Sequence, residues 1–286
     1  MNILITGATG NIGEAMIPHL QQTDNIFIGA RNCERTAATI NVDSFQYRRF
    51  DFEDEECYES AFEGIDRLFL LRPPHIADIN KVFRPMLLQA KKSGIKQIVF
   101  LSVLGADKNS IIPHAKIEKL ISELCFEYIF VRPSYFMQNL ITTLKDDVSS
   151  GCIMLPSGNA KFNWVDVYDI GEVAAYLLKH FGSYTNCAIT VTGEENLSFD
   201  EVVNIINDTI HSRINYKSVN LLRFYRHKKT QGVSRAMIMV MIMLHFLPRF
   251  EKEPEISSDI KKIIGRKPRN IAQFALDNAT RLKKRQ

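Results

Sequence analysis

A loop with three regularly spaced glycines lies near the start of the chain and could bind phosphate groups. Its sequence, Gly7-Ala8-Thr9-Gly10-Asn11-Ile12-Gly13, directly follows the apolar run Asn2–Thr6. Gly7 would permit a tight turn, Gly10 would let a pyrophosphate approach the backbone, and Gly13 would let a helix pack close to the strand. The N–H groups and the dipole at the start of that helix would attract the phosphates. The spacing predicts a dinucleotide site at Gly7, Thr9, Gly10, Asn11, Ile12 and Gly13.

An arginine stands where a dinucleotide site often carries an acid. An Asp or Glu about 20 residues after the glycines would bind the ribose hydroxyls of NAD. Here the second apolar run, Asn25–Ala30, is followed by Arg31-Asn32, with Arg35 shortly after. A guanidinium forms charge-assisted, bidentate bonds to a 2′-phosphate, which a carboxylate would repel. Arg31 therefore favours NADP(H) over NAD(H), the alternative being an arginine that simply faces solvent at a strand end.

Other kinds of chemistry have no support in the sequence. There is no GxxxxGK[ST] loop, no GxSxG elbow, no HExxH pair and no aspartate cluster with metal-ligand spacing. ATP hydrolysis, acyl transfer and metal catalysis are therefore not expected. The five cysteines are scattered and form no CxxC pair, which argues against a disulfide framework and a zinc site.

The predicted site needs a scaffold, and the order of short apolar runs and amphipathic stretches predicts one. Short apolar strands separated by helices are typical of an α/β fold with a parallel, doubly wound sheet. The expected strands are Asn2–Thr6, Asn25–Ala30, Ser44–Arg49, Arg67–Leu71, Gln97–Ser102 and Glu127–Val131, and the expected helices are Asn11–Gln21 and Ile79–Ser93.

The second half of the chain is expected to be mainly helical. Ser198 and Asp200 can cap a helix that runs through Ile210, and Trp164 is expected in the core. The remaining expected elements are the strands Phe162–Val165 and Cys187–Val191 and the helices Asp169–His180, Ser234–Phe246 and Asn270–Leu282, the last ending in the basic tail Arg281–Arg285.

Composition and charge point to a globular protein. The 286 residues are 45% hydrophobic and 24% charged, and no apolar run reaches the roughly 20 residues of a membrane span. The N-terminus lacks the features of a signal peptide, so a cytoplasmic protein without a membrane partner is expected. No Asp or Glu occurs from Thr209 to Phe250, a stretch with eight basic residues. This stretch could be a solvated face, or bind an anionic ligand or nucleic acid, although no nucleic-acid motif accompanies it.

The apolar stretch Ala236–Leu244 is rich in methionine and leaves several roles open. As a core helix it needs no function. Methionine is also adaptable and polarizable, which suits a lid over a planar substrate or the face of a homodimer.

The sequence resembles the NmrA-like group of atypical short-chain dehydrogenases. The resemblance is carried by the glycine loop and by Ala30-Arg31-Asn32, Asp51-Phe52, Pro113–Glu118, Val131–Asn139, Asp166–Ile170 and Gly265–Pro268. It implies NADP(H) and a doubly wound Rossmann domain over residues 1–134. It also implies a smaller, mainly helical substrate domain over 135–286, from which segment 160–192 is expected to return to the Rossmann sheet.

The resemblance also implies roles for residues beyond the loop. Asp51 and Phe52 would flank the adenine. Lys116 would bind the nicotinamide ribose, and Ser102 ends the fifth strand, where related enzymes place a catalytic serine. The nicotinamide side would be lined by Leu71, Arg72 and Pro73, and its carboxamide would meet the backbone of Pro133, Ser134, Tyr135 and Phe136.

The sequence departs from ordinary short-chain dehydrogenases at the proton donor. Those enzymes pair a lysine with a tyrosine four residues before it, and the tyrosine protonates the developing alkoxide. Four residues before Lys116 stands Ile112. The literal match Tyr225…Lys229 lies far downstream and is taken as accidental. His114 could donate a proton in place of the tyrosine, or make a structural hydrogen bond at a helix start.

Two functions remain open at this point. The first is an NADPH-dependent oxidoreductase that transfers hydride to a small quinone or carbonyl compound, with Lys116 and His114 as catalytic residues. A quinone suits the missing tyrosine, because its reduction gives a stabilised hydroquinone anion. The alternative is a redox-sensing regulatory protein that binds NADP(H) without turnover.

Overall fold

The structure, a computed structural model, describes residues 1–20 and 25–283 and divides into two compact units. The first unit comprises Met1–Pro133, Val167–Val191 and Asp259–Arg266. The second comprises Ser134–Asp166, Thr192–Ser258 and the described residues from Lys267 onward. Gln21, Lys284 and Arg285, which belong to the expected first helix and basic tail, lie outside the described residues.

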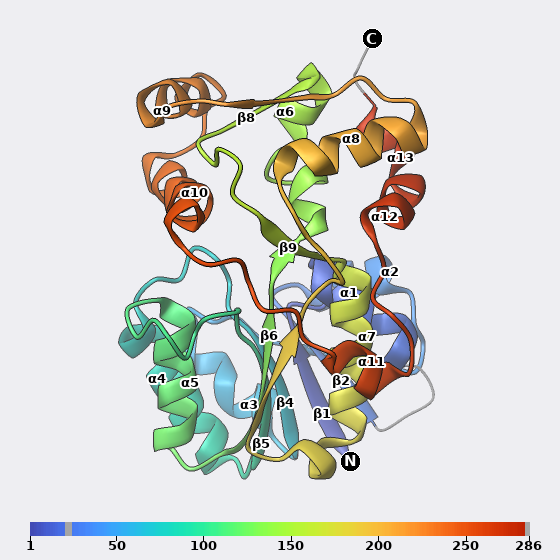
Figure 1. The fold of residues 1–286 in the computed structure, drawn as a ribbon. Helices are drawn as coiled ribbons and strands as arrows, with labels where there is room; N and C mark the ends of the chain where they lie inside the picture. The colour runs from blue at the N-terminus through green and yellow to red at the C-terminus, as the bar shows by residue number, and fades with distance from the viewer. Residues whose placement is uncertain (21–24, 284–286) are drawn as a thin grey trace. The chain divides into compact units, whose positions relative to one another are not determined.

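The first unit is built on a parallel sheet of seven strands in the order β10-β6-β5-β4-β1-β2-β3 (Figure 1). Because all its neighbours pair in parallel, the carboxyl ends of the strands share one edge. The strands are β1 (Asn2–Thr6), β2 (Asn25–Ala30), β3 (Gln46–Arg49), β4 (Arg67–Leu71), β5 (Gln97–Leu101), β6 (Glu127–Pro133) and β10 (Cys187–Val191).

Helices cover both faces of this sheet, which confirms the predicted doubly wound α/β fold (Figure 1). One face carries α3 (Tyr58–Phe62), α4 (Ile79–Lys92) and α5 (Pro113–Glu123), whose apolar side chains share a core with the strands. The other carries α1 (Asn11–Leu20) and α7 (Val167–Lys179). The remaining helical segments are α2 (Cys33–Ile40), α11 (Asp259–Ile264) and the short 3-10 turns η1 (Glu55–Cys57) and η3 (Phe181–Tyr184).

The second unit is mainly helical around two small sheets. One has the order β11-β9-β7 and the other pairs β12 with β8. Its core includes Trp164, which is 1% exposed, as predicted. The strands are β7 (Tyr135–Phe136), β8 (Cys152–Leu155), β9 (Phe162–Val165), β11 (Asn196–Leu197) and β12 (Asn215–Ser218). The helices are η2 (Met137–Ile141), α6 (Lys145–Ser150), α8 (Phe199–Ile210), α9 (Leu221–Thr230), α10 (Arg235–Phe246), η4 (Leu247–Phe250), α12 (Ile271–Asp277) and α13 (Ala279–Leu282).

The return of the chain to the large sheet differs in detail from the expectation. Residues 167–191 belong to the first unit, but β9 pairs with β7 and β11 in the second. The late segment Asp259–Arg266 also belongs to the first unit, where the Asp259 carboxylate accepts a hydrogen bond from the Thr190 backbone at 3.2 Å. A contact between residues so far apart in the sequence cannot be predicted from the pattern of neighbouring residues.

Two expected helices also differ. The helix over 270–282 is broken into α12 and α13, and the Asn278 side-chain amide donates to the Phe274 carbonyl at the break. In the methionine-rich α10, only Ile238, Met241 and His245 are buried. The interpretation as a core helix is therefore correct for the side that carries these three residues and wrong for the exposed side. Within the described residues, no helix is both long and apolar enough to cross a membrane.

One member of the basic stretch is not a surface residue. Lys228 on α9 is 1% exposed and donates to the Asp147 carboxylate on α6 at 2.6 Å. His227 and Gln231 bond the other carboxylate oxygen, both at 2.8 Å. A buried charge needs such partners, so this cluster holds α9 against α6.

Candidate functional site

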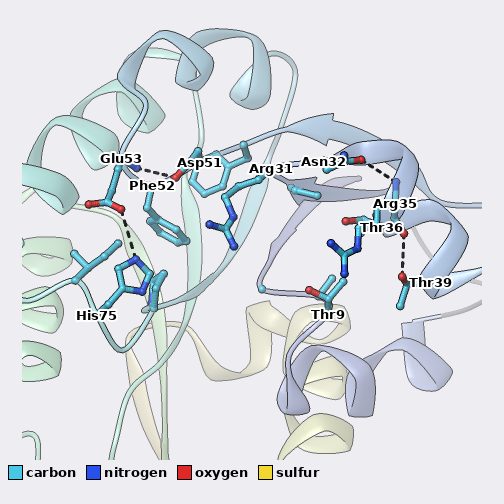
Figure 2. Close-up of a pocket in the computed structure, with 17 residues that line it drawn as sticks. Thr9, Arg31, Asn32, Arg35, Thr36, Thr39, Asp51, Phe52, Glu53 and His75 are labelled. Carbon is cyan, nitrogen blue, oxygen red and sulfur yellow. Dashed lines mark hydrogen bonds and ion pairs between the residues drawn. The ribbon is translucent and has the colours of Figure 1, made fainter. Parts of the chain in front are cut away.

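A pocket of about 550 Å³ opens in the first unit at the carboxyl ends of β1, β2 and β3 (Figure 2). The loop after β4 contributes a further wall. Ligands of open α/β sheets bind outside this edge of the strands. The pocket is lined by Gly7, Ala8, Thr9, Gly29, Ala30, Arg31, Asn32, Arg35, Thr36, Thr39, Phe50, Asp51, Phe52, Glu53, Pro73, His75 and Ile76.

The glycine loop forms the turn that its spacing predicts. Gly7 has a φ of 70°, a conformation that favours glycine, and its carbonyl accepts the Gly10 N–H at 3.0 Å. A Cβ on Gly13 would lie 2.4 Å from the Gly7 carbonyl oxygen, so Gly13 is required by the close packing of α1 on the loop. A Cβ on Gly10 would meet only that carbonyl oxygen, at 3.4 Å. Packing therefore does not demand a glycine at position 10, and the space beside it is open to a ligand.

Two arginines point into the pocket near Thr9 (Figure 2). Arg31 follows β2, and Arg35 lies in the first turn of α2, where its N–H donates to the Asn32 side chain at 2.9 Å. Both side chains are exposed, and neither makes an ion pair with another described residue. The pocket thus presents two uncompensated guanidinium groups beside the glycine loop, an arrangement that suits a phosphate.

The opposite wall is formed by the loop after β3. The Asp51 carboxylate accepts the Glu53 N–H at 3.1 Å, and Phe52 packs against Phe50 with ring centroids 4.9 Å apart. Glu53 also faces His75 from the loop after β4, with 3.6 Å between carboxylate and imidazole (Figure 2). Asp51 and Phe52 therefore lie at one wall of the pocket, and their contact with an adenine stays a prediction.

The loop between β4 and α4 is shaped by Arg72. Its guanidinium donates to the carbonyls of Pro73 and Pro74, both at 3.2 Å, and of Ile76 at 2.7 Å. Burial lowers the pKa of Arg72 below its usual range. Pro73 lines the pocket. Leu71 does not line it, but its side chain lies next to Gly7. Arg72 thus acts on the shape of the loop, since it is not one of the residues that line the pocket.

Ser102 and His114 do not line this pocket. Ser102 is 2% exposed at the end of β5, and its hydroxyl has no hydrogen-bond partner among the described residues. His114 lies in the first turn of α5, where burial and the nearby charge of Arg72 lower its pKa to about 4. Its imidazole is therefore neutral at pH 7, which makes it a weaker acid than the imidazolium that would best replace a tyrosine.

Lys116 is exposed and lies elsewhere on the first unit. It lines a second cavity, of about 430 Å³, together with residues of α4 and α5 such as Arg84 and Glu123. The structure does not bring Lys116 into the pocket of the glycine loop, so its role toward a ribose stays a prediction. Pro133 ends β6, and its carbonyl accepts the Leu104 N–H at 2.9 Å.

Tyr135 and Phe136 form β7 in the second unit. The Tyr135 ring packs against Trp164, with centroids 4.8 Å apart, and its hydroxyl lies 2.9 Å from Nε2 of the buried His245. The His245 Nδ1 lies 2.7 Å from the Met241 carbonyl, so that nitrogen carries the proton and Nε2 accepts from the tyrosine. The Tyr135 side chain is thus part of the core, and only its backbone stays available for the predicted contact with a carboxamide.

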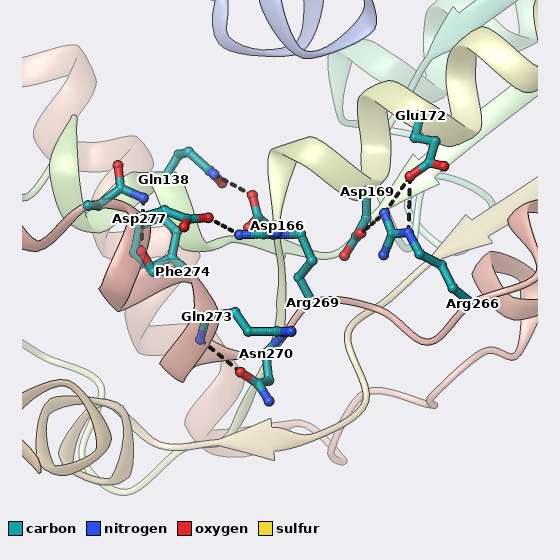
Figure 3. A network of polar contacts seen from close by, with 11 residues as sticks. Gln138, Asp166, Asp169, Glu172, Arg266, Arg269, Asn270, Gln273, Phe274 and Asp277 are labelled. Atoms are coloured by element: carbon teal, nitrogen blue, oxygen red, sulfur yellow. Dashed lines mark hydrogen bonds and ion pairs between the residues drawn. The ribbon is translucent and has the colours of Figure 1, made fainter. Parts of the chain in front are cut away.

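Several markers of the resemblance hold the structure together (Figure 3). In the second unit, the Asp166 carboxylate accepts from Gln138 at 2.6 Å and from Arg269 at 2.8 Å. In the first unit, Arg266 pairs with Asp169 at 2.6 Å and with Glu172. These residues fix loops and helix ends inside each unit rather than face the pocket.

The lining residues that the sequence did not single out include Thr36, Thr39, Phe50, Glu53, His75 and Ile76. The helical spacing of Thr36 and Thr39 after Arg35 could have placed them on the same face of α2. Glu53 and His75 meet only through the fold. No group of three or more His, Cys, Asp or Glu within residues 1–20 and 25–283 is arranged to hold a metal.

Solved structures share this fold. The triphenylmethane reductase of Citrobacter sp., solved with NADP(H), superposes with a TM-score of 0.85 at 22% identity over 97% of this chain and 99% of that one. The NADPH-dependent quinone oxidoreductase of Escherichia coli, solved with NADPH, gives 0.84 at 20% identity over 96% and 99%. NmrA, a negative transcriptional regulator solved with NADP, gives 0.71 at 16% over 96% and 94%. The cofactor in these complexes agrees with the one predicted from the sequence.

Curated relatives align over nearly the whole chain. Prestalk A differentiation protein A of Dictyostelium discoideum is 27% identical over 279 residues, which are 96% of this chain and 91% of the relative. The NAD(P)H azoreductase of Xenophilus azovorans is 26% identical over 281 residues, or 97% and 98%. The NmrA-like family matches residues 1–275, which confirms the resemblance seen in the motifs, and this protein is therefore a member of the NmrA-like family.

Proposed function

We propose that this protein is an NADPH-dependent oxidoreductase that transfers hydride to a small, apolar or planar acceptor, a quinone or a carbonyl compound. The observation that carries the proposal is the pocket of the first unit, where the glycine loop and two unpaired arginines lie together. The first unit is proposed to bind the cofactor and the second to bind the acceptor.

The pocket residues suit each part of NADP(H). The N–H groups that follow Gly10 at the start of α1 would receive the pyrophosphate. Arg31 and Arg35 would bind the 2′-phosphate, and Asp51 and Phe52 would flank the adenine. When bound, the nicotinamide would supply the hydride.

A quinone acceptor fits the residues better than an ordinary ketone does. Hydride transfer to a quinone gives a stabilised hydroquinone anion, which can take its proton from solvent, whereas a developing alkoxide needs a proton donor placed beside it. Ile112 stands at the tyrosine position, and His114 is neutral at pH 7. The names of the azoreductase, quinone oxidoreductase and triphenylmethane reductase similarly favour a conjugated acceptor.

The second candidate is a regulatory protein that senses the NADP(H) redox state without turnover. Two observations favour it: the neutral His114 at the start of α5, and the likeness to NmrA, which is described as a transcriptional regulator. A pocket for the cofactor is common to both functions, so binding alone does not separate them.

The test is steady-state oxidation of NADPH with a panel of quinones and carbonyl compounds, alongside a calorimetric titration with NADPH and NADP⁺. Binding with acceptor-dependent oxidation supports the enzyme. Tight binding without oxidation by any acceptor supports the sensor and contradicts the proposed hydride transfer.

A further inference from the structure

The exposed face of α10 is unlike that of an ordinary surface helix. From Ala236 to Leu244 every side chain is apolar, although only one side of the helix is buried. The outward side chains are Met237, Met239, Val240, Met243 and Leu244, each between 42% and 57% exposed. Surface helices of globular proteins normally carry polar residues on this side, and a continuous apolar patch marks an interaction site.

Exposed apolar side chains also occur in the segment that follows the helix and on α9. Leu247 and Phe250 in η4 are 45% and 74% exposed, and Leu222 on the neighbouring α9 is 60% exposed. The outward side chains are mostly long, flexible chains on a convex helix. This character suits insertion into a fluid phase more than close fitting to a rigid partner.

Positive charge flanks this face at both ends and on the neighbouring helix. Arg235 begins α10, Arg249 follows it in η4, and Arg223, Arg226 and Lys229 are exposed on α9, which contacts α10. None of the five makes an ion pair with another residue in the described part of the chain. The nearest acids in the sequence are Asp208 and Glu251, and Glu251 lines a small cavity together with Arg249. The five basic groups outnumber these acids and favour an anionic partner.

We propose that the surface formed by α9, α10 and η4 docks on an anionic lipid membrane, with the apolar face of α10 entering the headgroup boundary. A helix lying in the interface combines such an apolar face with Lys and Arg around it, and the basic groups attract acidic lipid. Such docking needs no spanning length. It also does not depend on the proposed enzymatic function.

A second copy of the chain fits this surface less well. In a symmetric dimer the same patch would face itself, so the unpaired arginines at the two ends of α10 would meet their own like charges. A membrane with acidic headgroups instead compensates all of them at once.

The experiment measures co-sedimentation of the full chain with vesicles of pure phosphatidylcholine or of phosphatidylcholine with about one third phosphatidylglycerol. The parent protein is expected to bind only the acidic vesicles and to dissociate as salt is raised, because salt screens the attraction. Arg249→Glu should weaken binding by roughly fivefold or more, following the contribution of each basic residue near such a surface. The double variant Val240→Asp/Met243→Asp should abolish it.

Leu276→Asp is the matched control. Leu276 is a similarly exposed apolar residue of the second unit, 60% exposed on α12, and its replacement should leave binding unchanged. Thermal melting of each variant checks the fold.

Failure of the parent to bind acidic vesicles would overturn the proposal, as would equal binding to both vesicle types. The proposal would also be overturned if light scattering showed that the parent is a dimer and the double variant a monomer, because a second copy of the chain would then cover the face. Retention on an acidic polypeptide without vesicle binding would instead assign the surface to a protein partner.

Discussion

At the scale of single residues, the preference for NADP(H) depends on Arg31. Its guanidinium is unpaired beside the glycine loop, so one charge-assisted contact to a 2′-phosphate should contribute about 1.4 kcal/mol or more. We expect NADPH to bind at least ~10-fold more tightly than NADH. Arg31→Asp should reverse that order, whereas Arg84→Asp, outside the pocket, should not change it. Calorimetric titration measures both affinities, and equal affinities in the parent protein would contradict the assignment.

Gly10 and Gly13 separate a ligand-facing glycine from a structural one. A Cβ at position 10 meets only one oxygen at 3.4 Å, so Gly10→Val should melt near the parent temperature while losing NADPH affinity by ~100-fold or more. A Cβ at position 13 lies 2.4 Å from backbone atoms, so Gly13→Ala should lower the melting temperature itself. Normal NADPH binding by Gly10→Val would show that the phosphate site has been misplaced.

Lys116 and His114 test the proposed chemistry. If Lys116 sets the angle of the nicotinamide, Lys116→Ala should reduce kcat/KM by ~100-fold, because small errors in geometry are costly. Its melting temperature should hardly change, since Lys116 is exposed. His114→Ala should cost less, because a neutral imidazole contributes little as an acid. If Lys116→Ala turns over at the parent rate, Lys116 does not position the nicotinamide, and its assignment to the ribose is contradicted.

His245 should make stability depend on pH. Burial, together with the nearby charge of Lys228, lowers its pKa to about 4 from 6.5, although its bond to Met241 and the charge of Asp147 act in the opposite direction. The unfolded chain therefore takes up a proton below pH 6.5 that the folded chain does not accept until about pH 4. The free energy of unfolding should fall by about 3 kcal/mol over this interval through His245 alone. Urea unfolding from pH 7 to 4 should show this loss, reduced in His245→Gln. An identical slope in that variant would contradict the burial of a neutral imidazole.

At the scale of elements, the approach of α1 to α7 depends on Gly171. A Cβ there would lie 2.7 Å from Cβ of Ala15, and neither helix can move without disturbing the sheet beneath. Gly171→Val should therefore destabilise the protein by about 1–3 kcal/mol or more. At Gly182 an added Cβ would meet nothing within 4 Å, so Gly182→Ala provides the control. Denaturant midpoints compare the two, and equal midpoints would show that the helices have room to separate.

The helices and strands that could be predicted are those determined by residues adjacent in the sequence. The bounds of β1, β2, β4, β9 and β10 agree with the apolar runs because buried strands carry their signal in a few adjacent residues. The break at Asn278 and the exposed face of α10 depend on packing partners elsewhere in the chain, and the sequence alone favoured a continuous helix and a core helix there. Glu53 and His75 meet at one wall of the pocket from different loops, which no spacing rule could have predicted.

At the scale of the whole molecule, the family and the dinucleotide fold were accessible from the sequence because their markers are short and contiguous. The catalytic assignment was not, because Lys116 and His114 do not line the pocket of the glycine loop and no spacing in the sequence could place them relative to it. The pocket of the glycine loop is lined by residues of the first unit alone. Cofactor binding should therefore tolerate changes in the second unit that abolish turnover.

Hydride transfer is tested most directly by rapid mixing of the protein, saturated with NADPH, with an excess of a small quinone in the absence of oxygen. The proposed oxidoreductase should give a single-turnover loss of the absorbance of the reduced nicotinamide, at a rate far above that of NADPH and quinone alone. Gly10→Val should abolish this loss. Tight binding of NADPH with no acceleration by any quinone or carbonyl compound would contradict hydride transfer and leave the redox sensor as the function.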